Sequence, residues 1–480
     1  MKKIVSVLLL VCLMLSLLSL AGCKKAQSMG GVFEVPEGGY DGSEVTITFY
    51  HTMGANLREV LDKYIVEFNK LYPNIHIKHE QVGDYDAVRD QIATEITVGN
   101  QPNIAYCYPD HVALYNKGNA VVTLDNLIAS TVEVKRADGT TEVLGLTAEQ
   151  IADFIPGYYN EGKCYGDNLM YTLPMSKSTE VLYYNKTFFE EHDLEVPTTW
   201  EEMAAVCARI KEIDPMSIPL GYDSEANWFI TMCEQYGSPY TSADGDRYLF
   251  DNETNRQFVT MFRDWYKKGY VTTKAINGGA YTSDLFTKIT TAEDPTKCYM
   301  CIGSTAGAAH QVPDKGEDGK YLFEVGIASI PQVDASKPKV ISQGPSLCIF
   351  GKENTQEVIA SWLFVKFLTT CVEFQADFSM VSGYVPVIQS VKDDAVYSEF
   401  LAKADGGSYL PALSTKMALA QADAYFVSPA FNGSSNARDE VGALMQKCLL
   451  LDGNNLEENI KKAFEEAVKK CKSKDISMMG

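Results

Sequence analysis

The chain has 480 residues, of which 46% are hydrophobic and 22% are charged, so it is long enough for two or three domains with substantial cores. Its formal net charge of −21 argues against nucleic acid as a partner, because proteins that bind nucleic acid concentrate positive charge. The charge does not exclude an anionic small ligand, since a pocket can be locally positive in an acidic protein.

The first 22 residues are typical of an export signal. Two lysines precede an apolar run over residues 4–20, which is short for a membrane span and lacks a stop-transfer pattern. The run ends in Leu-Ala-Gly-Cys, which resembles the bacterial lipobox, and this resemblance implies that Cys23 is lipidated and becomes the new N-terminus. Two or more acyl chains would anchor the chain stably. Residues 23–43 are rich in Gly, Ser and Pro and are predicted to form a flexible tether.

Strands and helices alternate in the next part of the chain. The predicted strands are 44–52, 74–82 and 104–107, and the predicted helices are 56–71, 84–98 and 112–117. This β-α-β-α-β order predicts a lobe with a mainly parallel sheet, in which ligands bind at the carboxyl ends of the strands. The side chains expected at that edge are Tyr50, His51, Tyr85, Tyr106, Tyr108 and Asp110.

The stretch from Leu173 to Trp200 begins with a strand of β-branched and aromatic residues and closes on a turn-like pair, Asn185-Lys186. Thr198 or Thr199 can cap the helix that Trp200 opens. Further helices are predicted at 228–236, 253–268, 355–369, 372–380, 444–450 and 456–471, and further strands at 297–302, 321–330 and 339–350.

The sequence contains none of the common motifs for a nucleophilic serine, a zinc protease or a phosphate-binding loop, and it predicts no metal site and no cofactor. Ten cysteines remain after Cys12 leaves with the signal and Cys23 takes the lipid. Most of them lie in apolar contexts and are expected to pack as small hydrophobic residues, while any disulfide connectivity stays open.

Two blocks together resemble the extracellular solute-binding protein family 1 of ABC importers. The first is Pro174–Trp200, with its Val-Leu-Tyr-Tyr-Asn-Lys run and Pro-Thr-Thr-Trp helix start, and the second is Val365–Pro386, a helix followed by Gly-Tyr-Val-Pro. The resemblance implies an α/β, two-lobed periplasmic-binding-protein fold with three interlobe crossovers and a ligand cleft between the lobes. The crossovers would lie near Ser178–Leu182, Gln343–Ser346 and Phe378–Val385. Lobe 1 would comprise residues 44–178 plus 345–380, and lobe 2 residues 179–344 plus 381–480.

Within the family, the chain is most similar to the members that bind glycerol-3-phosphate and sugars. This similarity implies a set of ligand-binding residues: Tyr85, Asp110, Lys177, Ser178, Trp228, Ser304, Gly344, Tyr384 and Arg438. A tryptophan face suits the carbons of a sugar or of glycerol, and a guanidinium can clamp a phosphate in a bidentate manner. Asp110 is one residue away from the acid position of the family, and Lys177 is an additional cation.

The function that follows is that of a substrate-binding lipoprotein, not an enzyme. It would capture a mono- or oligosaccharide and deliver it to the permease subunits of an ABC importer. It would be a monomer, lipid-anchored on the extracellular (or periplasmic) face of the cell membrane, with no nucleic acid partner. One alternative ligand is sn-glycerol-3-phosphate or a glycerophosphodiester. The alternatives of other classes are an exported glycoside hydrolase and an adhesive surface lipoprotein.

Overall fold

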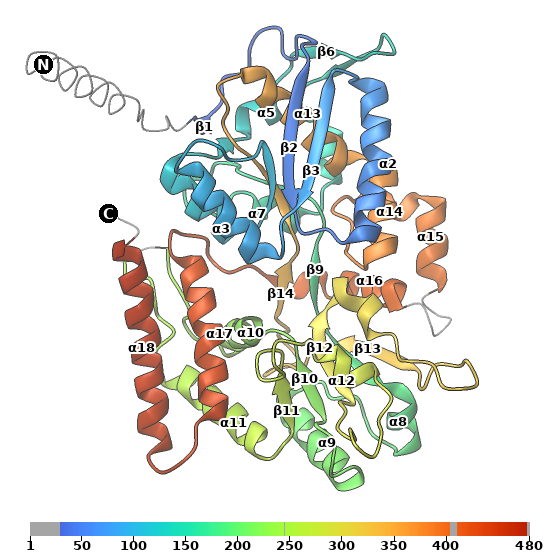
Figure 1. Cartoon of the computed structure of the whole chain (residues 1–480), viewed down its shortest axis with the longest axis vertical. Coiled ribbons are helices and arrows are strands. Elements are labelled where there is room, and N and C mark those ends of the chain that lie inside the picture. The colour runs from blue at the N-terminus through green and yellow to red at the C-terminus, as the bar shows by residue number, and fades with distance from the viewer. Residues whose placement is uncertain (1–28, 244, 404–409, 478–480) are drawn as a thin grey trace, which may run out of the picture.

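The computed structural model describes residues 29–243, 245–403 and 410–477, so the export signal (1–22) and Cys23 lie outside the described residues. Figure 1 shows two α/β lobes placed end to end, with strands running between them. Within the described ranges, no helix combines the length and the apolarity that crossing a bilayer requires.

The upper lobe is built on a five-stranded sheet in the order β3-β2-β4-β15-β8. Its strands are β2 (Val45–His51), β3 (Ile75–Gln81), β4 (Ile104–Cys107), β8 (Leu173–Pro174) and β15 (Ser346–Ile349). β2 pairs in parallel with β3 and β4, and β15 pairs antiparallel with β4 and β8. The helices of this lobe are α2 (Ala55–Leu71), α3 (Tyr85–Ile96), α4 (Pro109–Tyr115), α5 (Asp125–Ala129), α6 (Ala148–Asp153), α7 (Pro156–Glu161), α13 (Thr355–Thr370), α14 (Val372–Ser382) and α15 (Ala395–Ala402). The predicted β-α-β-α-β order at the start of the chain is confirmed.

The lower lobe is built on a seven-stranded sheet in the order β11-β10-β12-β9-β14-β16, with β13 also paired to β9. Its strands are β9 (Ser178–Asn185), β10 (Leu220–Tyr222), β11 (Val271–Thr273), β12 (Met300–Ser304), β13 (Val325–Ser329), β14 (Val340–Gln343) and β16 (Tyr425–Phe426). Its helices are α8 (Lys186–Glu191), α9 (Trp200–Ile213), α10 (Glu225–Tyr236), α11 (Glu253–Lys267), α12 (Ser283–Thr287), α17 (Ser434–Leu450) and α18 (Leu456–Ser477). α16 (Leu410–Ala420) packs against both lobes, with Ala412 in the upper core and Leu410 against β9 and its neighbours.

Local chemistry explains where several of these elements begin. Thr199 and Glu202 form a capping box at the start of α9, so Thr199 is the cap of the two that were predicted. Asn185 does not form the predicted turn. It ends β9, and its side chain accepts a hydrogen bond from the backbone N–H of Phe188, so it caps α8 directly.

Residues 29–43 do not behave as the predicted free tether. β1 (Gly31–Val32) pairs in parallel with β5 (Val122–Thr123), and Tyr40 is buried in the upper core. The apolar and aromatic side chains among the glycines of residues 29–43 therefore fix that segment to the lobe.

A separate hairpin in the same lobe is formed by two short antiparallel strands, β6 (Glu133–Lys135) and β7 (Thr141–Val143).

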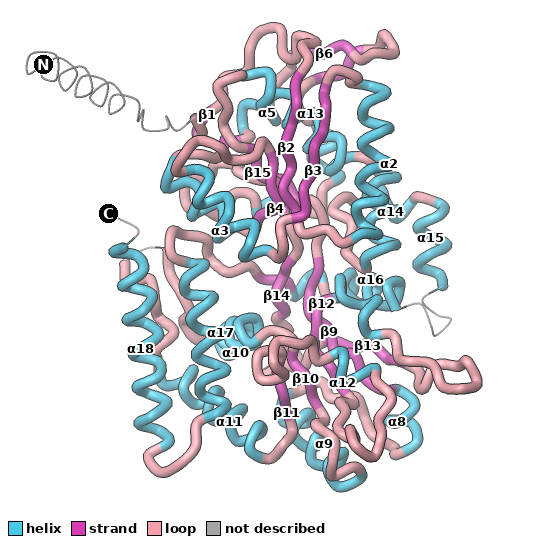
Figure 2. Tube along the Cα trace, viewed as in Figure 1, coloured by secondary structure: helices cyan, strands magenta, loops and turns pink. Residues whose placement is uncertain are grey.

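Three crossovers join the lobes, and Figure 2 shows β9 and β14 reaching toward the upper sheet. The first crossover consists of residues 175–177. The predicted crossover, Ser178–Leu182, lies just after it and already pairs with strands of the lower sheet. The second is Gly344-Pro345, which divides the predicted strand 339–350 into β14 and β15 in different sheets. The third runs through α16, because residues 385–400 still pack in the upper core and β16 belongs to the lower sheet. The predicted third crossover, Phe378–Val385, therefore lies within the upper lobe, and the packing does not follow the expected division of the chain at residue 380.

Two positions near the lobe boundary need glycine for steric reasons: Gly344 in the second crossover and Gly383 in the turn after α14. Gly344 has φ of +97° and Gly383 has φ of +78°, a region that side chains with a Cβ rarely adopt. A Cβ on Gly344 would lie 2.4 Å from the carbonyl oxygen of Ser176, and one on Gly383 would lie 2.7 Å from that of Thr305. Close approach between backbones at this boundary therefore excludes larger residues.

Lys177 connects the first two crossovers with the turn after α14. Its backbone exchanges hydrogen bonds with Val385, at 3.0 Å and 2.6 Å. Its ammonium group forms an ion pair with Glu161 and donates to Ser346 Oγ at 3.2 Å and to the Gly344 carbonyl at 3.3 Å. The Lys177 and Glu161 side chains are 0% and 3% exposed, so each charge depends on the other for compensation.

We expect Lys177→Met to lower the free energy of unfolding by about 3–5 kcal/mol, because it leaves the Glu161 carboxylate buried without its cation. Urea denaturation of the purified mature chain measures this loss. The double variant Lys177→Met/Glu161→Leu removes both charges and should recover most of the stability. A loss below about 1 kcal/mol in the single variant, which is the size typical of exposed ion pairs, would contradict this role.

Candidate ligand-binding cleft

A cavity of about 660 Å³ lies between the lobes, within the range of about 300–1,000 Å³ that is usual for small-molecule sites. Its upper wall comes from the segments that follow β3 and β4 and from the turn after α14. Its lower wall comes from β9, from the segments after β10 and β12, and from the first turns of α10 and α17. The carboxyl ends of β4, β10 and β12 thus face the cavity, as expected for α/β sheets.

Three tyrosines form the aromatic part of the upper wall. Tyr85 opens α3, which Asp84 caps, and its ring centroid lies 4.6 Å from that of Tyr108. The hydroxyls of Tyr85 and Tyr384 lie 3.2 Å apart. Burial is the main cause that raises the pKa of all three phenols, so they remain neutral hydrogen-bonding groups at physiological pH.

Asp110 lies at the junction of the two lobes. Its carboxylate accepts a hydrogen bond from Ser435 Oγ of α17 at 2.8 Å. Burial opposes the charged form, but His111 and then Arg438 favour it, and the pKa of Asp110 is lowered as a net result. Asp110 therefore presents an ionised acceptor to the cavity.

Glu180 and Arg438 lie on the lower wall with Asn227 between them. Tyr222 donates to Glu180 at 2.6 Å, and the Asn227 amide donates to it at 2.8 Å. The guanidinium of Arg438 donates to the amide oxygen of Asn227. Burial raises the pKa of Glu180 to about 7, although the hydrogen bonds from Tyr222 and Asn227 partly offset this effect.

The cavity is strongly acidic. Eight carboxyl side chains line it, against three side chains of Lys or Arg, and these eleven are Asp84, Asp86, Asp110, Glu180, Asp223, Glu225, Asp284, Asp439, Arg89, Lys274 and Arg438. Arg89 forms ion pairs with Asp86 and, across the lobes at 3.6 Å, with Asp439. Most hydrogen-bonding capacity in the cavity is therefore that of acceptors, which suits ligands rich in hydroxyl groups.

Six of the nine predicted residues line this cavity: Tyr85, Asp110, Ser178, Ser304, Tyr384 and Arg438. Lys177, Trp228 and Gly344 do not line it. Lys177 is buried in its ion pair with Glu161. Gly344 does not reach the cavity, although its neighbour Gln343 lines it.

Trp228 is a correction to the prediction. It is 0% exposed and lies in the lower core, where its ring stacks on Tyr222 with centroids 4.9 Å apart and contacts Phe262 at 4.2 Å. Tyr222 belongs to β10 and Phe262 to α11, so side chains of these two elements cover the ring. A ring enclosed in this way cannot serve as a stacking platform unless the core opens.

Sequence reasoning missed Glu180, Asp223 and Asn227. Glu180 follows Ser178 by two positions on β9, so the two side chains share a face of the sheet and reach the cavity together. Asp223 directly follows the carboxyl end of β10, and Asp110 likewise lies shortly after the carboxyl end of β4. The positions of Glu180 and Asp223 could have been noticed in the sequence, but the chain has so many carboxylates that these two did not stand out.

The raised pKa of Glu180 predicts a pH dependence of stability. Between its ordinary pKa of 4.5 and about 7, the folded state binds more protons at this group than the unfolded state does. The free energy of unfolding should therefore fall as pH rises through this window, by up to about 3 kcal/mol. Glu180→Gln should reduce that slope in urea denaturation between pH 4.5 and 8. Glu190→Gln, which alters a 67% exposed carboxyl on α8, is the control. Equal slopes for wild type and Glu180→Gln would exclude this effect.

Among curated proteins, the chain is similar to the sn-glycerol-3-phosphate-binding periplasmic protein UgpB of Shigella flexneri, with 24% identity over 365 residues, 72% of this chain and 75% of the relative. The protein of the same name from Escherichia coli K12 is 23% identical over the same shares of the two chains.

Two solved structures share the fold. UgpB from Mycobacterium tuberculosis in complex with glycerophosphocholine has a TM-score of 0.69 and 17% identity, and the match covers 89% of this chain and 98% of that one. The cyclic alpha-maltosyl-1,6-maltose binding protein from Arthrobacter globiformis has a TM-score of 0.65 and 16% identity, with coverage of 90% and 100%. The family model described as bacterial extracellular solute-binding protein matches residues 63–404. The chain therefore belongs to the bacterial extracellular solute-binding protein family, and it is the solute-binding component of an ABC importer.

Proposed function

We propose that the protein binds a mono- or oligosaccharide in the cleft between its lobes and delivers it to the permease of its importer. The observation that carries this proposal is the excess of eight carboxyl side chains over three cationic ones around the cavity. Carboxylates accept hydrogen bonds from sugar hydroxyls, whereas they repel a phosphate ester. Solved structures of the same fold bind cyclic alpha-maltosyl-1,6-maltose or maltotriose, which supports this ligand class.

The tyrosines of the upper wall add the second half of a sugar site. The rings of Tyr85 and Tyr108 offer apolar faces to the C–H groups of a pyranose, and the hydroxyls of Tyr85 and Tyr384 offer neutral donors. Ser178 and Ser304 add small hydroxyls from the lower wall. In this proposal the six predicted residues at the cavity bind ligand together with Glu180 and Asn227.

The alternative ligand is sn-glycerol-3-phosphate or a glycerophosphodiester. Arg438 supports it, because a guanidinium at the cavity wall can bind phosphate, and the UgpB relatives carry that specificity in their names. Against it, Arg438 already donates to Asn227 and lies near Glu180, and Arg89 is compensated by acidic neighbours. Sugar is therefore the first proposal and phosphate ester the second.

The remaining parts of the proposal concern the setting of the protein. Its relatives bind solutes and are not enzymes, so we propose a role without catalysis rather than that of a glycoside hydrolase or an adhesin. We also propose a lipid anchor at Cys23, a position on the outer face of the membrane and a monomeric state. Metabolic labelling with a radioactive or alkyne fatty acid, lost in Cys23→Ala, tests the anchor.

A thermal-shift screen of sugars, polyols and phosphate esters, followed by calorimetry, tests the ligand class. A bound sugar at 100 times its Kd should stabilise the fold by about 2.7 kcal/mol. Tyr85→Ala should weaken that binding about tenfold, because it removes an aromatic face of the cavity. The control is Tyr236→Ala, which removes a tyrosine that is 42% exposed on α10 and outside the cavity.

The phosphate alternative makes the opposite prediction. If phosphate esters alone stabilise the protein, and Arg438→Ala abolishes their binding, the sugar proposal is wrong. If sugars bind and glycerol-3-phosphate does not, the alternative is excluded.

A further inference from the structure

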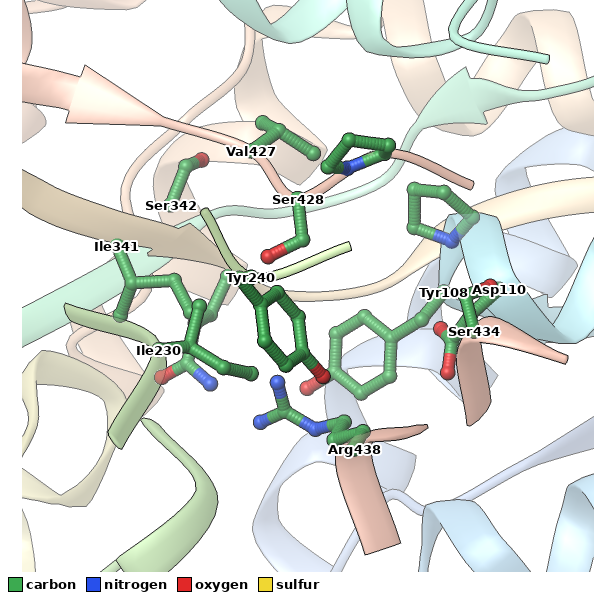
Figure 3. A pocket seen from close by; sticks show the side chains of 13 residues that line it. Tyr108, Asp110, Ile230, Tyr240, Ile341, Ser342, Val427, Ser428, Ser434 and Arg438 are labelled. Atoms are coloured by element: carbon green, nitrogen blue, oxygen red, sulfur yellow. The ribbon is translucent and has the colours of Figure 1, made fainter. Parts of the chain in front are cut away.

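A second, smaller cavity opens beside Arg438 and is called the side pocket here (Figure 3). It has a volume of about 70 Å³, about a tenth of that of the main cavity. Tyr108, Asp110, Gln343 and Arg438 line both spaces, so the side pocket adjoins the main cavity at Arg438. Its volume suits a substituent of a ligand whose body lies in the main cavity.

The walls of the side pocket are mainly apolar. Ile230 of α10, Ile341 of β14 and Val427 after β16 contribute aliphatic groups, and Pro109 and Pro429 complete the rim. Figure 3 shows Ile341 and Val427 on the side of the pocket away from Arg438. A carbon-containing group entering the pocket would therefore exchange water for aliphatic contacts.

Three hydroxyl groups in these walls lack partners. The oxygens of Tyr240, Ser342 and Ser428 are buried and have no hydrogen-bond partner among the described residues. In Figure 3 the hydroxyl of Ser428 points toward the ring of Tyr240, whereas that of Ser342 points away from both residues. Buried polar groups are normally hydrogen-bonded, so the hydroxyl of Ser428 indicates a partner that enters the pocket from outside, either ligand or water.

Charge restricts what can enter. Asp110 and Arg438 are the charged side chains in the lining of the side pocket, and both lie toward its junction with the main cavity. Asp110 accepts from Ser435, and Arg438 donates to Asn227. A charged substituent would lose hydration without meeting a free counter-charge, so an uncharged one is favoured.

We propose that the side pocket receives a small uncharged substituent of the sugar, with a methyl carbon against Ile230, Ile341 and Val427 and an oxygen beside the hydroxyl of Ser428. The N-acetyl group of an amino sugar has this chemistry, and the pocket would select for N-acetylated ligands. This inference rests on the proposed function, because it requires a sugar in the main cavity.

Calorimetry with two matched pairs of probes tests it: N-acetylglucosamine against glucose, and N,N′-diacetylchitobiose against cellobiose. Wild type should bind the N-acetylated member of at least one pair ten or more times more tightly. Val427→Phe fills the side pocket from its rim and should reduce that preference to less than threefold, with the affinity for the parent sugar unchanged. Val381→Phe is the matched control, since Val381 is 40% exposed and outside both cavities, against 38% for Val427.

Ser428→Ala provides a second variant that adds no volume, and it should lower the preference about threefold while the melting temperature stays that of wild type. Equal or tighter binding of the parent sugars overturns the inference and leaves the proposed function standing. A preference that survives Val427→Phe also overturns it. Binding of phosphate esters with no binding of any sugar, or no binding of any probe, overturns the proposed function and the inference together.

Discussion

The buried ion pair between Lys177 and Glu161 is the interaction on which the two-lobed arrangement depends. Lys177 lies in the first crossover, and it holds the second through Gly344 and Ser346 and the turn after α14 through the backbone of Val385. Three chain segments that are far apart in sequence are therefore held at one point without access to water. A hinge of this kind absorbs rotation in a few residues while the sheets on either side remain rigid. Gln375 reinforces it, since its side chain donates to the carbonyl of Met175.

Polar contacts also join the lobes across the cleft. Ser435 of the lower lobe donates to Asp110 of the upper lobe, and Arg89 lies 3.6 Å from the 40% exposed Asp439. The Arg89–Asp439 pair contributes little net free energy, because water can replace a partly exposed ion pair when the lobes separate. A ligand that adds hydrogen bonds to both walls would therefore decide the balance between open and closed forms. The hinge fixes where the lobes rotate, and the cavity determines which ligand stabilises the closed form.

The sequence carries much of this fold in its local patterns. Alternation over residues 44–52 and 74–82 is sufficient for β2 and β3, and the Thr199-Glu202 pair is sufficient for the start of α9. Tyr85 and Asp110 could be assigned to the cavity because each follows a parallel strand, whose carboxyl end faces the ligand edge. The resemblance supplied the first two crossovers to within a few residues, but it placed the third too early in the chain.

What could not be predicted depends on partners distant in sequence. In the sequence Lys177 is an additional cation without a visible partner, and the structure places Glu161 of α7 against it. The resemblance alone gave Trp228 a role in binding ligand, and the structure packs Phe262 of α11 against its ring. The side pocket has the same origin, because α10, β14 and the segment after β16 form it together. Burial is a property of the assembled lobes, and a single sequence gives no direct measure of it.

Arg438 shows why family likeness alone does not determine the ligand. In isolation, a guanidinium at the cleft wall favours phosphate. Here its amide partner Asn227 also donates to Glu180, so Arg438 and a buried carboxyl group share one hydrogen-bonded network. The guanidinium is thereby oriented as a hydrogen-bond donor, while its charge is largely compensated by the acidic lining. An oriented but compensated donor suits a neutral oxygen of a sugar better than a phosphate, even though the residue type is the same.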